Sequence, residues 1–207
     1  MSLILQEQGK YVNRESLLFF GVCVFVYYTI DNLDGKQARR TKSSTPLGMC
    51  MDHGCDVLGV SFISLGVARM ALIDDNITLL FTAQIGVLGT FWLSVWAQYH
   101  SQGVLLLGKV NAVDDGIPAV AFMGIASYIF GQQIWDTDLG IITAKYILVI
   151  FIWVAGVGKI EIILGQIIGF IFNGDNFTKD LKSALKHLIH FPLLSLSLLS
   201  VVIFTNW

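Results

Sequence analysis

The sequence predicts an all-α polytopic membrane protein, on the basis of its composition and its long apolar stretches. Of the 207 residues, 55% are hydrophobic and 14% are charged, and the mean hydropathy is +0.69. Soluble domains carry about 25% charged residues. A helix that crosses a bilayer needs about 20 mostly apolar residues, and the chain has about six such stretches. We therefore expect a polar segment over residues 1–14, followed by a single transmembrane domain over residues 15–207.

The expected spans follow one another with short polar connections. They cover approximately residues 15–31, 57–73, 77–99, 115–133, 139–158 and 188–206. The fifth continues as an apolar run to Phe172, which fits either one over-long helix or a spanning helix followed by an interfacial one. Lysine and arginine are concentrated after the odd-numbered spans, and short cytoplasmic loops carry such an excess. The loop after the first span is therefore expected to face the cytoplasm or its organellar equivalent.

Charge and cysteine content exclude several classes of protein. The formal net charge of -2 excludes a strongly basic nucleic-acid binder, so no nucleic-acid partner is expected. Three cysteines are too few for a disulfide framework, and they lack a second pair for a zinc site. They are interpreted as reduced thiols: Cys23, Cys50 and Cys55.

Four aspartates lie at helical spacings around the loop after the first span. They are Asp31, Asp34, Asp52 and Asp56. The first two are three residues apart and share one face of the first helix, and the last two are four apart on the next helix. Thr45 fits an N-cap and Pro46 fits the first position of that next helix. Helices that lie side by side would bring the two pairs of carboxylates together.

Close carboxylates without a counter-charge repel one another, and divalent cations remove that repulsion. Oxygen ligands suit magnesium, manganese or calcium, and a two-metal site would hold phosphate oxygens during a displacement at phosphorus. Gly35, Ala38 and Gly48 are small residues beside the acids that leave space for a ligand, and Arg39 is placed to contact a phosphate. The plainer alternative is a solvated charged loop beside a transmembrane helix.

The order of these residues resembles a family signature. Asp-x2-Asp-Gly-x2-Ala-Arg-x8-Gly-x3-Asp-x3-Asp is matched at every defined position over residues 31–56, and it is similar to the signature of the CDP-alcohol phosphotransferases. The segments "DGKQARRTKSSTPLG" and "DHGCD" resemble the eukaryotic choline and ethanolamine phosphotransferase branch. So does "VLLLGKVNAVDDGI", which places Asp115 where the family usually has glutamate. The similarity covers residues 17–117 approximately, and beyond them it rests mainly on hydropathy.

The resemblance implies transfer of phosphocholine or phosphoethanolamine from CDP-choline or CDP-ethanolamine to diacylglycerol, with release of CMP. It implies two Mg²⁺ or Mn²⁺ ions on Asp31, Asp34, Asp52 and Asp56. It implies that CDP is bordered by Gly35, Ala38, Arg39, Gly48 and Asp115. His53 and Asp56 would be catalytic, with His53 as the proton acceptor. The residue chemistry agrees, because an alcohol nucleophile needs a base and the histidine pKa of about 6.5 suits neutral pH; a helix-surface histidine is the alternative.

Two departures from the family leave a second function open. We expect the chain to lack the helix that usually precedes the signature, and Met49 stands where glutamate is common after the signature glycine. The alternative is therefore an inactive structural or accessory subunit of a larger membrane complex derived from the family. Homodimers are expected of the family, and a shortened chain could pair differently. The resemblance implies the endoplasmic reticulum or another endomembrane, with the mitochondrial inner membrane as the alternative.

A third class, an ion or solute pathway, is disfavoured by where the charges lie. Acids that line a pathway are distributed through the spans, whereas these aspartates cluster at one end. Arg69 and Lys145 lie inside apolar stretches. We expect each of them to pair with an acid or to extend its charge to the membrane interface.

Overall fold

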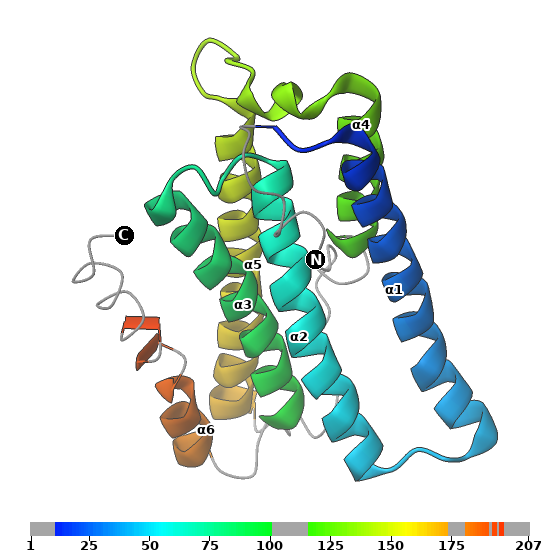
Figure 1. Ribbon diagram of the computed structural model, residues 1–207. Coiled ribbons are helices and arrows are strands. Elements are labelled where there is room, and N and C mark those ends of the chain that lie inside the picture. The colour runs from blue at the N-terminus through cyan, green and yellow to red at the C-terminus, as the bar shows by residue number, and fades with distance from the viewer. Residues whose placement is uncertain (1–10, 101–115, 174–180, 191, 194, 197–207) are drawn as a thin grey trace. The chain divides into compact units, whose positions relative to one another are not determined.

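The computed structural model describes residues 11–100, 116–173, 181–190, 192–193 and 195–196. The described residues form helices, together with an isolated antiparallel bridge between Asp138 and Thr143. In chain order the elements are α1 (Arg14–Thr41), α2 (Pro46–Met70), α3 (Ile77–His100), α4 (Ile117–Phe130), the 3₁₀ helix η2 (Gln132–Asp136), α5 (Ala144–Asn173) and α6 (Leu181–Leu188) (Figure 1). The all-α prediction is confirmed.

Three of the described helices are long and apolar enough to cross a bilayer. They are Arg14–Thr41, Ile77–His100 and the Ala144–Gly169 part of α5. The chain is therefore an integral membrane protein. α4 is apolar but has only 14 residues, and α2, with 25 residues, is not among the three. The expected sixth span lies mostly outside the described residues, so the number six stays a prediction, whereas the apolar run of the fifth span forms one long helix.

The ends of α1 follow from local capping. Asn13 precedes the helix, and its side chain accepts a hydrogen bond from the amide of Glu15 at 3.3 Å. At the other end Lys42 adopts the left-handed conformation with φ 57°, and its amide donates back to the carbonyl of Arg39. The helix thus continues well past the expected span limit at residue 31, and it carries the first half of the signature as ordered helix.

α2 begins as predicted. Thr45 is the N-cap in an extended conformation, and its hydroxyl accepts a hydrogen bond from the amide of Gly48 at 3.0 Å. Pro46 is the first helical residue, where a missing amide hydrogen has no cost because that amide has no helical partner. This start sets the rotation of α2 and hence the face on which Asp52 and Asp56 lie.

Contacts divide the chain into two compact units. The first comprises Met1–Asn76 and Asn111–Val149. In this unit α1 packs most extensively against α4, and the two lie side by side in Figure 1. Gly21 and Gly124 meet at this contact. A buried cluster of Val24, Ile117 and Ala121 continues it toward the half-buried Tyr27.

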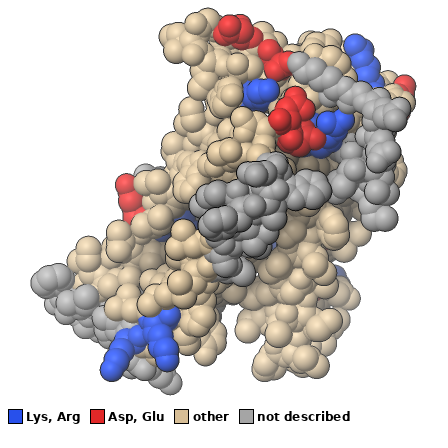
Figure 2. All heavy atoms as spheres, turned by 60° about the vertical axis from the view of Figure 1, so that its left-hand side comes forward, with Lys and Arg blue, Asp and Glu red and all other residues tan. Residues whose placement is uncertain are grey.

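Ion pairs in the first unit lie at the end of α2 opposite Asp52. Arg69 pairs with Asp74 at 3.0 Å, and Lys145 pairs with Asp136 at 3.3 Å. On the face in Figure 2, acidic and basic side chains lie next to one another at the end that carries η2. Both basic residues are therefore paired with acids, as the sequence predicts.

The second unit comprises Ile77–Val110 and Ile150–Trp207, and its described part holds α3, most of α5 and α6. Trp96 of α3 donates its indole hydrogen to the carbonyl of Ala184 in α6 at 3.0 Å. Ala97 and Ile163 complete the buried cluster around this contact. The single transmembrane domain expected over residues 15–207 stays a prediction.

Candidate active site

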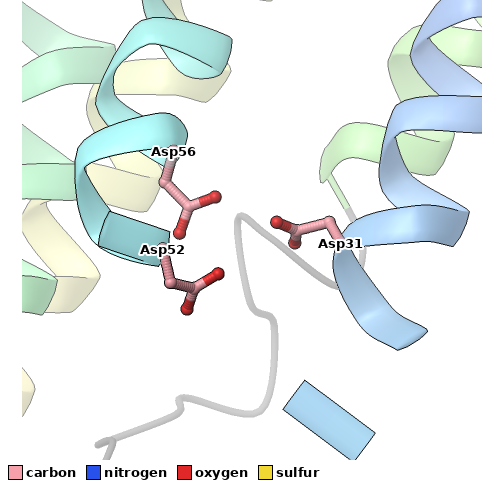
Figure 3. Close-up of side chains that lie close together, drawn as sticks. All are labelled: Asp31, Asp52 and Asp56. Atoms are coloured by element: carbon pink, nitrogen blue, oxygen red, sulfur yellow. The ribbon is translucent and has the colours of Figure 1, made fainter. Parts of the chain in front are cut away.

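Three aspartates from two helices lie together in the first unit. Asp31 is on α1, and Asp52 and Asp56 are one turn apart on α2. One carboxylate oxygen of each lies within 4.8 Å of one from each of the others. Figure 3 shows the three carboxylates directed toward one another across the space between the two helices. All three side chains are half-buried. The convergence expected from the spacing is therefore present for three of the four aspartates.

This arrangement fits the geometry of a divalent cation. Two oxygens bound to one ion at about 2.4 Å lie no more than about 4.8 Å apart, so three oxygens this close suit one coordination sphere. Carboxylates are the ligands that Mg²⁺, Mn²⁺ and Ca²⁺ prefer. Among the described residues this is the one group of three or more acids, histidines or cysteines that meets the spacing. The donor set therefore fits a hard divalent metal.

Asp34, the fourth predicted ligand, lies one turn beyond Asp31 on α1 and is exposed. It lies outside the group of three close carboxylates. Its negative charge nevertheless acts on Asp52 across the two helices. Asp34 is thus exposed and outside the close group, but within the electrostatic reach of Asp52.

The acids of the cluster influence one another's ionisation. Burial raises the pKa of the Asp52 carboxyl, and the negative charges of Asp56 and Asp34 raise it further, whereas the nearby His53 lowers it. A like charge in a half-buried site disfavours the ionised carboxylate because the repulsion is poorly screened. A bound cation would reverse this balance, since it stabilises the ionised form of each ligand.

His53 is half-buried on α2, directly after Asp52 and three residues before Asp56. The three-residue spacing puts His53 and Asp56 on neighbouring positions of one helix face. His53 also acts electrostatically on Asp52, so it lies close to the acids. His53 lies outside the group of three close carboxylates.

Four of the five predicted nucleotide-binding residues lie on α1 and α2, the two helices that carry the acidic group. The guanidinium of Arg39 folds over Gly35, and a Cβ added to Gly35 would lie 3.4 Å from its Nη1 atom. Gly48 faces Thr45, whose hydroxyl would lie 3.2 Å from an added Cβ, so this glycine also serves the N-cap. Ala38 is half-buried on α1. Asp115, the remaining predicted residue, lies outside the described residues.

Two residues near the cluster were not predicted. The hydroxyl of Tyr27 on α1 donates a hydrogen bond to Oδ1 of Asp56 at 3.0 Å. Gly59 on α2 faces the same tyrosine. Helical spacing could have indicated both residues from the sequence. Tyr27 precedes Asp31 by four residues, and Gly59 follows Asp56 by three. Neither belongs to the signature.

A cavity of about 310 Å³ lies within the second unit. Aromatic rings and histidines line it: Trp92, Val95, Trp96, Tyr99, His100, His187 and His190. This lining offers no carboxylate. A pair of hard cations needs oxygen ligands, so phosphoryl chemistry fits the aspartates and not this cavity.

Comparison with known protein families identifies the family of the chain. The sequence model of the CDP-alcohol phosphatidyltransferase family matches residues 2–160. The chain belongs to this family. Residues 31–56, with their four aspartates, lie entirely within the match, which confirms the resemblance seen in the sequence.

Several curated members of the CDP-alcohol phosphatidyltransferase family are similar to the chain. An uncharacterized class-I family protein 3 of Dictyostelium discoideum is 44% identical over 115 residues, covering 56% of this chain and 29% of that protein. Cholinephosphotransferase 1 of Homo sapiens is 34% identical over 157 residues, covering 74% and 34%. Choline/ethanolaminephosphotransferase 1 of Arabidopsis thaliana is 32% identical over 141 residues, covering 68% and 34%. The chain thus matches about a third of the length of each relative.

Proposed function

We propose that the chain carries the catalytic core of a CDP-alcohol phosphotransferase of the choline or ethanolamine type. It would transfer phosphocholine or phosphoethanolamine from the CDP ester to diacylglycerol and release CMP. The observation that carries this proposal is the convergence of Asp31, Asp52 and Asp56 from two helices, inside the family signature. The names of the human and Arabidopsis relatives support the choice of headgroup class.

We infer that Asp31, Asp34, Asp52 and Asp56 hold two Mg²⁺ or Mn²⁺ ions. Such ions would neutralise the diphosphate of the CDP ester and stabilise charge on the leaving phosphate. Three of the four acids form one close group, and the exposed Asp34 would help to hold a second ion near the diphosphate. The acids of this chain would thus bind the cations, and the cations would bind the anionic diphosphate of the substrate.

His53 is the proposed proton acceptor. The hydroxyl oxygen of diacylglycerol would attack the phosphorus that carries choline or ethanolamine, and its proton would pass to an imidazole nitrogen of His53. A new phosphorus–oxygen bond forms to the glycerol, while the bond to the bridging oxygen of CMP breaks and CMP leaves with that electron pair. A positioned base of this kind contributes about 10²- to 10⁴-fold to rate.

Arg39 is the proposed contact for the diphosphate. Its guanidinium lies over Gly35 and is exposed, so its donors are available to phosphate oxygens without desolvating a buried charge. Guanidinium groups match phosphate with two parallel hydrogen bonds. The small side chains of Gly35, Ala38 and Gly48 would let the nucleotide approach the helix backbones, and Asp115 would border it as well.

The membrane setting supports a lipid acceptor. α1 presents large apolar side chains outward along its length, including Phe19 at 62% exposure and Phe25 at 56%. Diacylglycerol dissolved in the bilayer could therefore approach the helix that carries Asp31. An endomembrane location agrees with this lipid chemistry, and homodimerisation is part of the proposal.

A transferase assay tests the proposal. The purified full chain in lipid nanodiscs is incubated with Mg²⁺, diacylglycerol and radiolabelled CDP-choline or CDP-ethanolamine, and the labelled lipid is counted. We expect product from the wild type and a fall in kcat of about 100-fold or more for His53→Gln. Asp75→Asn is the matched control, because Asp75 is exposed and lies outside the acidic group. No labelled lipid from a folded, metal-binding wild type would contradict the proposal and favour an accessory subunit.

A further inference from the structure

The hydrogen bond from Tyr27 to Asp56 joins α1 to α2 beside the acidic group. The phenolic oxygen lies 3.0 Å from Oδ1 of Asp56. The tyrosine ring is half-buried against the cluster of Val24, Ile117 and Ala121, so its position is held by packing and not by the hydrogen bond alone. A donor fixed in this way restricts the orientation of the carboxylate that it contacts.

Gly59 provides the space that Tyr27 occupies. A Cβ added to Gly59 would lie 2.5 Å from the hydroxyl oxygen of Tyr27 and 2.7 Å from Cζ. Carbon atoms do not approach this closely, so any side chain at position 59 would displace the ring. Gly59 lies one turn after Asp56 on the same helix. The tyrosine and the glycine therefore form a matched pair across the two helices.

The hydrogen bond from Tyr27 makes the two carboxylate oxygens of Asp56 inequivalent. Oδ1 accepts the hydrogen bond from Tyr27, which uses one of its lone pairs and makes Oδ2 the more available oxygen for a cation. A carboxylate held in this way favours contact with an ion through one oxygen over chelation through both. Mg²⁺ requires near-octahedral geometry with single-oxygen contacts, whereas the larger Ca²⁺ accepts carboxylates that chelate through both oxygens.

We propose that Tyr27 is a positioning residue that holds Asp56 as a single-oxygen ligand and thereby selects Mg²⁺ or Mn²⁺ over Ca²⁺. The proposal rests on the metal site assigned under the proposed function. Hydrogen bonds to ligating side chains orient the ligands and tune the metal, and their loss typically lowers metal affinity or activity about 10- to 100-fold. Tyr27 would act in this way without touching the substrate.

Tyr27→Phe isolates the hydroxyl, because phenylalanine fills the same volume and conserves the ring packing. The test uses the full chain in nanodiscs and measures Mn²⁺ binding by electron paramagnetic resonance, with Mg²⁺ and Ca²⁺ as competitors. We expect the Mn²⁺ affinity to fall about 10-fold or more and the ratio of Ca²⁺ to Mg²⁺ affinity to rise. Tyr128→Phe is the matched control, because Tyr128 lies in α4 of the same unit with its side chain 39% exposed.

A second pair of variants separates positioning from packing. Gly59→Ala should displace Tyr27 and lower Mn²⁺ affinity together with thermal stability. Adding Tyr27→Leu should remove the clash and restore stability while the Mn²⁺ affinity stays low, since no hydroxyl is restored. A double variant that regains both would overturn the proposal.

Asp56→Asn distinguishes failure of this inference from failure of the proposed function. If Asp56→Asn abolishes Mn²⁺ binding while Tyr27→Phe changes neither the Mn²⁺ affinity nor the Ca²⁺ to Mg²⁺ ratio, the role of Tyr27 is refuted and the metal site stands. If Asp56→Asn also binds Mn²⁺ as the wild type does, the assignment of Asp56 as a ligand fails, and the role of Tyr27 fails with it.

Discussion

Gly21 of α1 and Gly124 of α4 are in direct backbone contact. A Cβ on Gly124 would lie 2.8 Å from the Cα of Gly21 and 3.0 Å from the carbonyl oxygen of Leu17. Small residues let membrane helices approach this closely, so that dispersion contacts replace lipid contacts. α1 carries Asp31, and its packing on α4 therefore helps to hold one side of the acidic group.

Gly124→Ala should destabilise the protein, because the added methyl group has to push α1 and α4 apart. Overpacking of this kind costs about 1–3 kcal/mol, which exceeds the roughly 1 kcal/mol that alanine gains over glycine in a helix. We expect a lower thermal unfolding midpoint in detergent. Gly158→Ala is the control, because nothing lies within 4 Å of a Cβ added there. Equal midpoints for the two variants would argue against the close contact.

Asp52→Asn should change how stability depends on pH in the absence of divalent cations. The pKa of Asp52 is raised in the folded protein, so the native state holds this proton more tightly than the unfolded chain does. The stability contribution is fully present below the unfolded pKa of about 3.9 and is lost as pH rises through the raised folded pKa. Asparagine carries no such proton.

The measurement is the unfolding midpoint in EDTA at a series of pH values from acid to neutral. We expect the wild-type midpoint to fall with rising pH more steeply than that of Asp52→Asn. Excess Mg²⁺ at neutral pH should raise the wild-type midpoint and have little effect on the variant. Parallel curves for the two proteins would refute the electrostatic coupling of Asp52 to its neighbours.

Arg39→Ala should weaken binding of the CDP ester with little change in stability, because the side chain is exposed. Loss of hydrogen bonds to a charged group costs about 1.5–3 kcal/mol, which corresponds to a KM about 10- to 100-fold higher. The control is Arg40→Ala, since Arg40 is also exposed and follows directly on the same helix. The KM for CDP-choline of each variant is measured by steady-state kinetics. Equal KM values for Arg39→Ala and Arg40→Ala would contradict a role of Arg39 in binding the CDP ester.

Thr45→Ala should loosen the first turn of α2. The hydroxyl of Thr45 accepts the amide hydrogen of Gly48 at 3.0 Å, and loss of such a cap costs about 0.5–2 kcal/mol. Hydrogen exchange of the Gly48 amide, followed by mass spectrometry of the peptides that cover this turn, should become faster. Thr45→Ser retains the oxygen and should exchange as the wild type does. Unchanged exchange in Thr45→Ala would mean that the cap contributes little.

Local spacing predicted the parts of the molecule that local chemistry decides. Thr45 and Pro46 marked the start of α2, and the spacing of Asp52 and Asp56 predicted a shared face, because helix capping and periodicity involve residues within one or two turns. The same spacing predicted that Asp31 would approach them, although it required the assumption that α1 and α2 lie side by side.

Contacts between distant segments could not be read in the same way. The approach of Gly21 to Gly124 and the hydrogen bond from Tyr27 to Asp56 each depend on how two helices rotate and cross. Glycine is common in membrane helices, so its presence alone does not mark a crossing point. The sequence placed Asp34 on the first helix beyond the apolar span, but it gave no end for that helix, since hydropathy reports the limit of the bilayer and not the end of the helix.

The central claim is that α1 and α2 together form one divalent-cation site. Equilibrium binding of Mn²⁺ to the purified full chain, compared between wild type, Asp31→Asn and Asp52→Asn, tests it most directly. Each substitution removes a carboxylate from a different helix, and we expect each to weaken Mn²⁺ binding by about 10-fold or more. Unchanged Mn²⁺ binding in either folded variant would contradict a site shared by the two helices.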